Sequence, residues 1–485
     1  MSIMSAFSGP VKLAECQRRV SCFPSVPFLG GVGVVKVRLI QPTRDRIGRV
    51  HLNSPGSIFE DFRTAVLESV LAGESAREFS WPVLGEFNWA LDWFDEYALG
   101  NEQSALVWYG TEGVRKSISY AELRERSDRA AAWLVRHGVG PGSPVLVSLR
   151  SGAALWEIML AIVKLNAIIV PVPADASSDR IMEAAVLSGS TVIIATPELA
   201  QETSLSPPWV GITAGGQVPG WVPYEEAYSR SIAFRSGRRP DVTAPMIIDC
   251  STGPEKSEGG AILPYSGYAS TVGRVADLHF TRLAPGTGYV SIAAAGSIDY
   301  LLYTFLGPLV AGVAVVSLDP AEIPGLEPIL AAESIRSVYA CPECADAVSG
   351  AAGEADLFTS APVNHPTIRG FLGPGEPSLP DSLRWGVRHR QSTVAMTGTV
   401  RPGPRGSRVV QVLPGHEWEI VPSGVERTPL SGDVCVRLSN WPVPPRRTSG
   451  TATADGQRLA TGLAGHLVSD GAVVLDAGRR MGRAS

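Results

Sequence analysis

Between Ser119 and Ala195, strand-length apolar runs alternate regularly with helix-length amphipathic segments. Ser119 and Glu122 have the spacing of a capping box, and Gly138 stands where the helix that they begin should end. The expected elements that follow are a strand at 145–149, a helix at 155–165, a strand at 168–172, a helix at 180–187 and a strand at 191–195. Because a helix separates each strand from the next, this pattern predicts an α/β fold with a parallel sheet covered on both faces.

The rest of the chain is less regular. Pro and Gly are dense over 200–243, which predicts a loop-rich connector, and the α/β pattern resumes after about residue 285 and weakens again over 345–405. Short β-like runs then follow at 409–413, 418–421, 434–438 and 473–475. We therefore expect an unassigned leader at 1–57, for which a disordered tail is one reading, α/β subdomains at 58–405 and a small β subdomain at 406–485.

Composition excludes several classes of protein. The 485 residues carry 42 Lys and Arg against 47 Asp and Glu, so the net charge of −5 gives no electrostatic footprint for nucleic acid. The apolar run 301–318 has membrane length, but Gly307, Pro308 and Gly312 interrupt it, which predicts a buried helix, a turn and a strand. The N-terminus lacks the order of a signal peptide. We expect a cytoplasmic protein that contacts neither membrane nor nucleic acid.

Six cysteines in a chain of this length do not form a disulfide framework. Cys341 and Cys344 make a single CxxC with no second pair and no histidine at zinc spacing. A redox or metal role and a plain buried turn both fit this pattern, and a reduced compartment is the simplest reading of the cysteine usage.

Several short segments, in order along about 400 residues, resemble the AMP-forming acyl-CoA synthetases of the adenylate-forming superfamily. The segments with the best match are Phe87–Asp95, Ser119–Leu123, Gly138–Gly142, Lys164-Leu165 leading into Val170-Pro171, and Gly307–Leu309. The first of them is most similar to the medium-chain branch, which activates aliphatic (fatty) or aryl acids. The resemblance implies the large N-terminal domain of that fold, with two βαβ-type subdomains and a small β subdomain.

The resemblance also implies a two-step chemistry. A carboxylic acid attacks the α-phosphate of ATP, giving acyl-AMP and pyrophosphate, and the thiol of CoA then displaces AMP. The residues that match the family's nucleotide contacts are Ser251, Thr252, Gly253, Lys256, Gln391, Ser392 and Arg479. ATP or AMP, Mg²⁺ and CoA are the implied cofactors, and neither a catalytic residue nor a metal ligand is assigned. Ile292, Tyr300, Tyr303 and Phe305 match the region of the acyl pocket, although core packing explains them equally well.

Four departures from the family pattern affect nucleotide contacts. Asp249, Glu255 and Glu258 place carboxylates around a loop that should hold phosphates, where like charges repel. The Mg²⁺-binding glutamate is missing from His389–Thr393, and Leu463 replaces the aspartate that binds the ribose. No lysine follows Lys256, and the sequence stops six residues past Arg479, so the C-terminal lid of the family is expected to be absent.

The sequence thus predicts an acyl-CoA synthetase-like ligase homologue that cannot complete ATP-driven adenylation and CoA ligation alone. The alternative is a non-catalytic pseudoenzyme or partner subunit that binds a carboxylic acid or an acyl-adenylate. For self-sufficient ligation, we expect that a protein partner would have to supply the lid.

Overall fold

The structure is a computed structural model of the full chain. It describes residues 54–73, 79–110, 113–229, 234, 237–250, 262–362, 383–388, 395–402, 408–421, 432–437, 458–467 and 473–475. Contacts divide the chain into two units, Met1–Leu52 and Asn53–Ser485, and all described residues belong to the second.

Among the described residues, the first sheet has seven strands, in the order β7-β6-β5-β3-β4-β8-β9. Their bounds are β3 Pro144–Ser148, β4 Ile168–Pro171, β5 Val192–Ala195, β6 Val210–Thr213, β7 Val222–Pro223, β8 Pro245–Asp249 and β9 Leu263–Ser266. All neighbours are parallel except β8 and β9. This sheet confirms the parallel arrangement that the alternating pattern predicts.

The second sheet has 13 strands among the described residues, in the order β17-β18-β19-β20-β16-β15-β14-β13-β12-β10-β11-β1-β2. Its parallel part comprises β1 Ser104–Tyr109, β10 Tyr289–Ile292, β11 Val315–Leu318, β12 Ser337–Ala340, β13 Asp356–Pro362 and β14 Arg384–Arg388. The antiparallel part comprises β2 Arg115–Ser119, β15 Ala395–Pro402, β16 Arg408–Val412, β17 Trp418–Val421, β18 Gly432–Arg437, β19 Arg458–Leu467 and β20 Val473–Leu475. Two parallel-rich sheets in a mixed α/β chain match the expected fold class.

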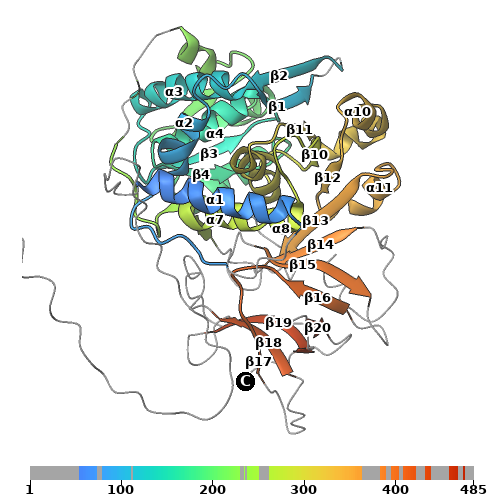
Figure 1. Ribbon diagram of the computed structural model, residues 1–485. Helices are drawn as coiled ribbons and strands as arrows, with labels where there is room; N and C mark the ends of the chain where they lie inside the picture. Colours follow the sequence, from blue (N-terminus) through green and yellow to red (C-terminus); the bar gives the residue numbers. More distant parts are fainter. Residues whose placement is uncertain are drawn as a thin grey trace, which may run out of the picture. The chain divides into compact units, whose positions relative to one another are not determined.

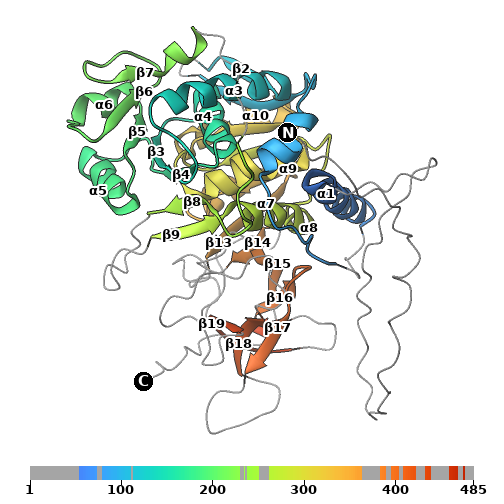
Figure 2. The same cartoon turned by 90° about the vertical axis from the view of Figure 1, so that its left-hand side faces the viewer.

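Helices cover the sheets (Figures 1 and 2). The longer ones are α1 Pro55–Leu71, α3 Tyr120–Arg136, α4 Ala153–Lys164, α5 Ser178–Ser188 and α7 Gly267–Ala276. The shorter ones are η1 Ala90–Phe94, α2 Asp95–Tyr97, α6 Pro197–Glu202, η2 Tyr224–Tyr228, α8 Leu278–Thr281, η4 Tyr300–Leu306, α9 Gly307–Ala311, η5 Pro320–Gly325, α10 Leu326–Ala332 and α11 Ala345–Ser349. Helix α1 lies beside α7 and α8 in both views. Within these described segments, no helix combines the length and apolarity needed to cross a membrane.

Local sequence rules account for the ends of helix α3. The Ser119 side chain accepts a hydrogen bond from the Glu122 amide, and the Glu122 carboxylate accepts one from the Ser119 amide, so the predicted capping box is present. After the helix, Gly138 has φ +86°, a conformation that glycine adopts without strain. Both ends of this helix therefore lie where the sequence predicts them.

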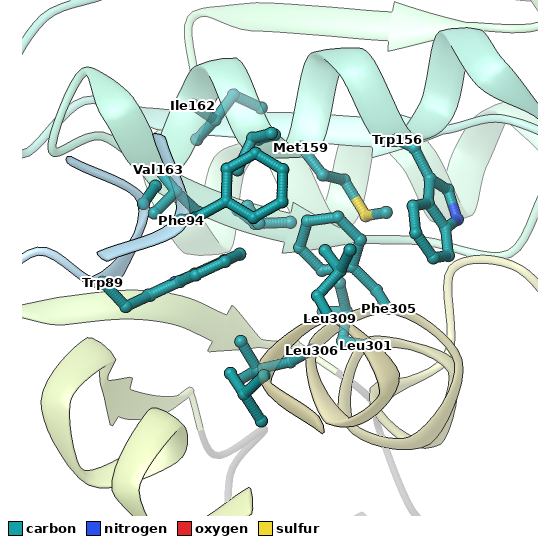
Figure 3. Close-up of a cluster of buried hydrophobic side chains, with 14 of the residues drawn as sticks. Trp89, Phe94, Trp156, Met159, Ile162, Val163, Leu301, Phe305, Leu306 and Leu309 are labelled. Carbon is teal, nitrogen blue, oxygen red and sulfur yellow. The ribbon is translucent and has the colours of Figure 1, made fainter. Parts of the chain in front are cut away.

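The main hydrophobic core lies between the two sheets, where α4 packs against η4 and α9. In Figure 3, Trp156 of α4 and Phe305 of η4 point toward one another, and their ring centroids are 5.2 Å apart. Trp89 and Phe94 enter the same cluster from the segment around η1. Burial of such large aromatic side chains contributes about 1.5–3 kcal/mol each, so this interface is a major source of stability.

Three sequence predictions need correction. The connector at 200–243 contains strands β6 and β7, which are too short to be recognised amid Pro and Gly. The weak region at 345–405 holds β13, β14 and β15, and β19 was not predicted at all. The run 301–318 begins as predicted with buried helix, but its first part, η4, is a π-helix. The domain boundary at 405 stays a prediction.

Candidate functional site

The carboxyl ends of the parallel strands in the two sheets face each other through a network of hydroxyl groups. Ser151 follows β3 of the first sheet, and its Oγ lies 2.7 Å from the Tyr300 hydroxyl and 2.8 Å from Oγ of Ser317. Ser317 belongs to β11 of the second sheet. The Trp156 Nε1–H also donates to the Tyr300 hydroxyl over 3.0 Å. These bonds join the two edges directly.

Two backbone segments, one from each sheet, also approach each other closely between these edges. Gly296, after β10, has φ +87°, and a Cβ at this position would overlap the carbonyl oxygen of Val172, which follows β4. Only glycine permits this contact. In open α/β sheets, ligands bind outside the carboxyl ends of the strands, so the region between these two edges is the candidate ligand site.

At one side of this site, β8 ends at Asp249, which is 9% exposed. Arg180 of α5 donates a hydrogen bond from its guanidinium to the Cys250 carbonyl oxygen and pairs with Glu183 at 2.9 Å. Burial raises the pKa of the Cys250 thiol to about 11, and the nearby Asp249 carboxylate adds to this. The backbone is thus held at the point where the segment with the phosphate-loop resemblance begins.

At the other side, β14 ends at Arg388, which is almost fully buried. One of its terminal nitrogens donates to Asp299 Oδ1 over 2.7 Å. Burial acts to lower the pKa of Arg388, but the Asp299 carboxylate and the neighbouring tyrosines together outweigh it, so the net pKa is raised. The buried guanidinium is therefore charged and neutralised by a carboxylate at this edge.

A second buried ion pair lies nearby. Arg274 and Asp277, three residues apart on and after α7, approach to 2.5 Å, and the Arg274 guanidinium lies 4.7 Å from the Tyr303 ring centroid. Tyr303 stacks on Tyr339 of β12 with centroids 4.4 Å apart. Both tyrosines are fully buried, and burial raises their pKa values, so both hydroxyls are protonated at neutral pH.

The apolar positions matched to the acyl pocket lie in the core. Ile292, Tyr300, Tyr303 and Phe305 are each no more than 2% exposed. Tyr300 is fixed by its hydrogen bonds and Phe305 by its contact with Trp156. Core packing therefore accounts for these four side chains in the structure.

The nucleotide contacts suggested by the resemblance fall outside the described residues. These are Ser251, Thr252, Gly253, Lys256, Gln391, Ser392 and Arg479. Their neighbours are described: the segment 251–261 follows β8, and 389–394 follows β14. Because both strands run parallel to the central strands of their sheets, the two segments start at the carboxyl edges that border the candidate site.

Leu463 lies within β19, where its backbone is in register with Val434 of β18.

The structure also identifies charged residues that the sequence analysis missed, above all Asp299 and Arg388. The sequence offered two signals for them: Asp299 is a polar residue inside the apolar run 298–306, and Arg388 ends a strand. The part of the chain that the structure describes contains no cluster of three His, Cys, Asp or Glu side chains able to hold a metal ion.

Comparisons with known proteins agree with this arrangement. Residues 95–397 match the family model for AMP-binding enzymes. A crystal structure of a Brucella canis acyl-CoA synthetase superposes with a TM-score of 0.65 at 17% identity, covering 88% of this chain and 80% of that one. The anthranilate CoA ligase AuaEII in complex with anthranoyl-AMP superposes with a TM-score of 0.59 at 16% identity, covering 81% and 78%.

Among curated proteins, nonribosomal peptide synthetase NPS2 of Ceriporiopsis subvermispora is 23% identical over 319 residues. That match covers 58% of this chain and 12% of NPS2, so the chain corresponds to a small part of this relative. The mixed α/β fold, with its two parallel-rich sheets, is that of the N-terminal domain of adenylate-forming proteins. The chain belongs to the AMP-binding enzyme family.

Proposed function

We propose that this chain binds a carboxylic acid, or the acyl-adenylate formed from it, between the carboxyl edges of its two sheets. We further propose that it does not complete ATP-driven adenylation and CoA ligation by itself. It is thus an acyl-CoA synthetase-like homologue that retains binding of the acyl-adenylate but has lost the ability to synthesise it alone.

The observation that carries this proposal is the charge at the end of β8. Asp249 is buried there, and the next nine residues add Glu255 and Glu258 with one cation, Lys256, while the nearby Arg180 guanidinium is paired with Glu183. Two like charges 4 Å apart repel by about 4 kcal/mol at an effective dielectric constant of 20. The β- and γ-phosphates of ATP would add several negative charges to this region, and such a site should bind ATP weakly.

An acyl-adenylate avoids most of this cost, because it carries one phosphate group and no β- or γ-phosphate. The AuaEII structure holds anthranoyl-AMP, which is a ligand of this kind in a protein of the same fold. The hydrogen bonds from Ser151 to Tyr300 and Ser317 and the Gly296–Val172 contact hold the two edges in a preorganised arrangement, which lowers the ordering cost of binding a ligand there.

A non-catalytic role as a partner subunit is the second candidate. The leucine at 463 supports it, since an alkyl side chain cannot accept the ribose hydrogen bond that the family's aspartate accepts. The need for a lid from another protein stays a prediction, and so do the seven nucleotide-contact positions.

The test is acid-dependent exchange of labelled pyrophosphate into ATP, measured with a panel of aliphatic and aryl acids and Mg²⁺. We expect no exchange above background. The double variant Glu255→Gln/Glu258→Gln should bind Mg-ATP at least several-fold more tightly than the unmodified chain. Glu327→Gln, an exposed position on α10, is the matched control and should leave ATP affinity unchanged. Acid-dependent exchange by the unmodified chain at rates typical of enzymes would contradict the proposal.

A further inference from the structure

Cys341 and Cys344 are linked by a disulfide bond directly after β12, at the carboxyl edge of the second sheet. Their Cα atoms are 5.2 Å apart, within the usual 4.4–6.8 Å range for bridged cysteines. The sequence analysis left a redox role and a plain buried turn open for this CxxC, and it predicted no disulfide framework. This single bridge spans only two intervening residues.

The backbone holds the two cysteines together independently of the sulfur–sulfur bond. The Cys341 amide donates to the Ile292 carbonyl at the end of β10 over 2.9 Å. The Cys344 amide donates to the Cys341 carbonyl over 2.8 Å, and the Val348 amide donates to the Cys344 carbonyl over 2.9 Å. With both thiols reduced, this turn would keep them adjacent, so the bond can open and close without rearranging the fold.

The two cysteines are themselves buried, but the turn that carries them reaches the surface. Each cysteine retains 8% exposure, and Glu343 between them is exposed. Cys250 provides a contrast, because it is 3% exposed and its raised pKa keeps it as an unreactive thiol at neutral pH. Cys250 and Cys435, which form no disulfide and are both buried, therefore serve as internal references for labelling of the Cys341–Cys344 pair.

We propose that Cys341 and Cys344 form a redox-active pair that undergoes reversible thiol–disulfide exchange with a low-molecular-weight disulfide of the glutathione class. In the oxidising direction, one cysteine thiolate attacks the small disulfide and releases one small thiol. The second cysteine then attacks the resulting mixed disulfide, forms the Cys341–Cys344 bond and releases the second small thiol. Two electrons pass from the cysteine pair to the small disulfide, and the two protons end on the released thiols.

The pair is coupled to the candidate ligand site through β12. Tyr339, two residues before Cys341, stacks on Tyr303, which lies under the Arg274 guanidinium beside the Arg388–Asp299 ion pair. Opening the bond removes a covalent constraint just after β12 while the backbone hydrogen bonds of the turn stay in place, and we expect ligand affinity to change. This consequence rests on the proposed function, whereas the exchange chemistry does not.

The experiment follows alkylation of the folded full-length chain in glutathione buffers of increasing oxidised fraction, with peptide mapping by mass spectrometry. Cys16→Ser/Cys22→Ser is the background, which removes the two cysteines outside the described residues. We expect Cys341 and Cys344 to lose labelling together as the buffer becomes oxidising, and to regain it when excess dithiol is added. Labelling of Cys250 should stay low throughout.

Single variants Cys341→Ser and Cys344→Ser should each stop at a mixed disulfide with glutathione on the remaining cysteine. If Cys341 and Cys344 stay labelled at every buffer composition, or if the bond withstands excess dithiol in the folded chain, the exchange proposal is overturned. Because labelling needs no nucleotide, its result is independent of whether the chain binds an adenylate. Affinity for a sulfamoyl acyl-adenylate analogue, compared between the two redox states, then tests the coupling, and equal affinities would overturn it.

Discussion

Arg388 donates a hydrogen bond to Asp299 over 2.7 Å, and this bond joins the end of β14 to the residue that precedes η4. The Arg388 side chain is 2% exposed and that of Asp299 is 15% exposed. Removing one partner of such a buried pair leaves the other uncompensated.

We predict that Arg388→Met lowers the free energy of unfolding by about 3–5 kcal/mol, because the partly buried Asp299 carboxylate loses the cation paired with it. The double variant Arg388→Met/Asp299→Asn should recover part of that loss. Urea denaturation of the unmodified chain, Arg388→Met, Asp299→Asn and the double variant gives the four free energies of unfolding for a double-mutant cycle. A single variant within about 1 kcal/mol of the unmodified chain would show that the pair contributes little.

Gly312 tests the packing of α1 against the core. It has φ +74°, and a Cβ there would lie 2.5 Å from the Tyr97 hydroxyl and 3.0 Å from Nη2 of Arg63. Gly312→Ala should cost about 2–4 kcal/mol, through both backbone strain and overlap. Gly142→Ala is the control, since Gly142 has φ +76° but open space around it. Equal destabilisation in the two variants would mean that overlap with Arg63 and Tyr97 contributes nothing to the loss of stability.

Lys164 provides a second test of buried charge. Its ammonium group is fully buried on α4 and lies 2.7 Å from Asp95 and 2.6 Å from Asp128. Lys164→Met should destabilise the chain by about 3–5 kcal/mol, because two neighbouring carboxylates then lack their shared cation. Lowering the pH should rescue the variant relative to the unmodified chain, since protonation removes the carboxylate charges. Thermal denaturation at several pH values shows this, and a pH-independent difference would argue against it.

His416 should make the stability depend on pH. Burial lowers the pKa of His416 to about 4, below the ordinary value of 6.5. The unfolded chain binds a proton near pH 6.5 and the folded chain only near pH 4, so stability falls as pH drops through that window. NMR titration of the imidazole should give a midpoint near 4, and His416→Gln should weaken the pH dependence. A midpoint near 6.5 would refute this reading.

Elements with strong local signals could be predicted from the sequence. The capping box at Ser119 and the alternation that follows locate α3, β3, α4, β4, α5 and β5, because each signal is short-range. Strands β13 and β14 were missed, since polar residues interrupt their apolar pattern. Arg384 is one such residue, and contacts distant in sequence explain its burial, above all its hydrogen bonds to Asp356 at 2.7 and 2.8 Å.

The candidate site was predictable only as a set of motif positions. Asp299 and Arg388 are 89 residues apart in sequence, and a pairing at that separation depends on the order of β10, β12, β13 and β14 in the sheet. The motif alignment located the segments after β8 and β14. It could not identify the buried charged residues, Asp249 and Arg388, at which those two strands end.

Isothermal titration calorimetry of the full-length chain tests the central claim most directly. Mg-ATP, AMP and a non-hydrolysable acyl-sulfamoyl adenosine are titrated separately at physiological salt. We predict that the acyl-adenylate analogue binds with the highest affinity and Mg-ATP with the lowest, because Asp249 and the two glutamates that follow β8 in the sequence, Glu255 and Glu258, oppose the additional phosphates. Mg-ATP binding as tight as that of the analogue would contradict the account.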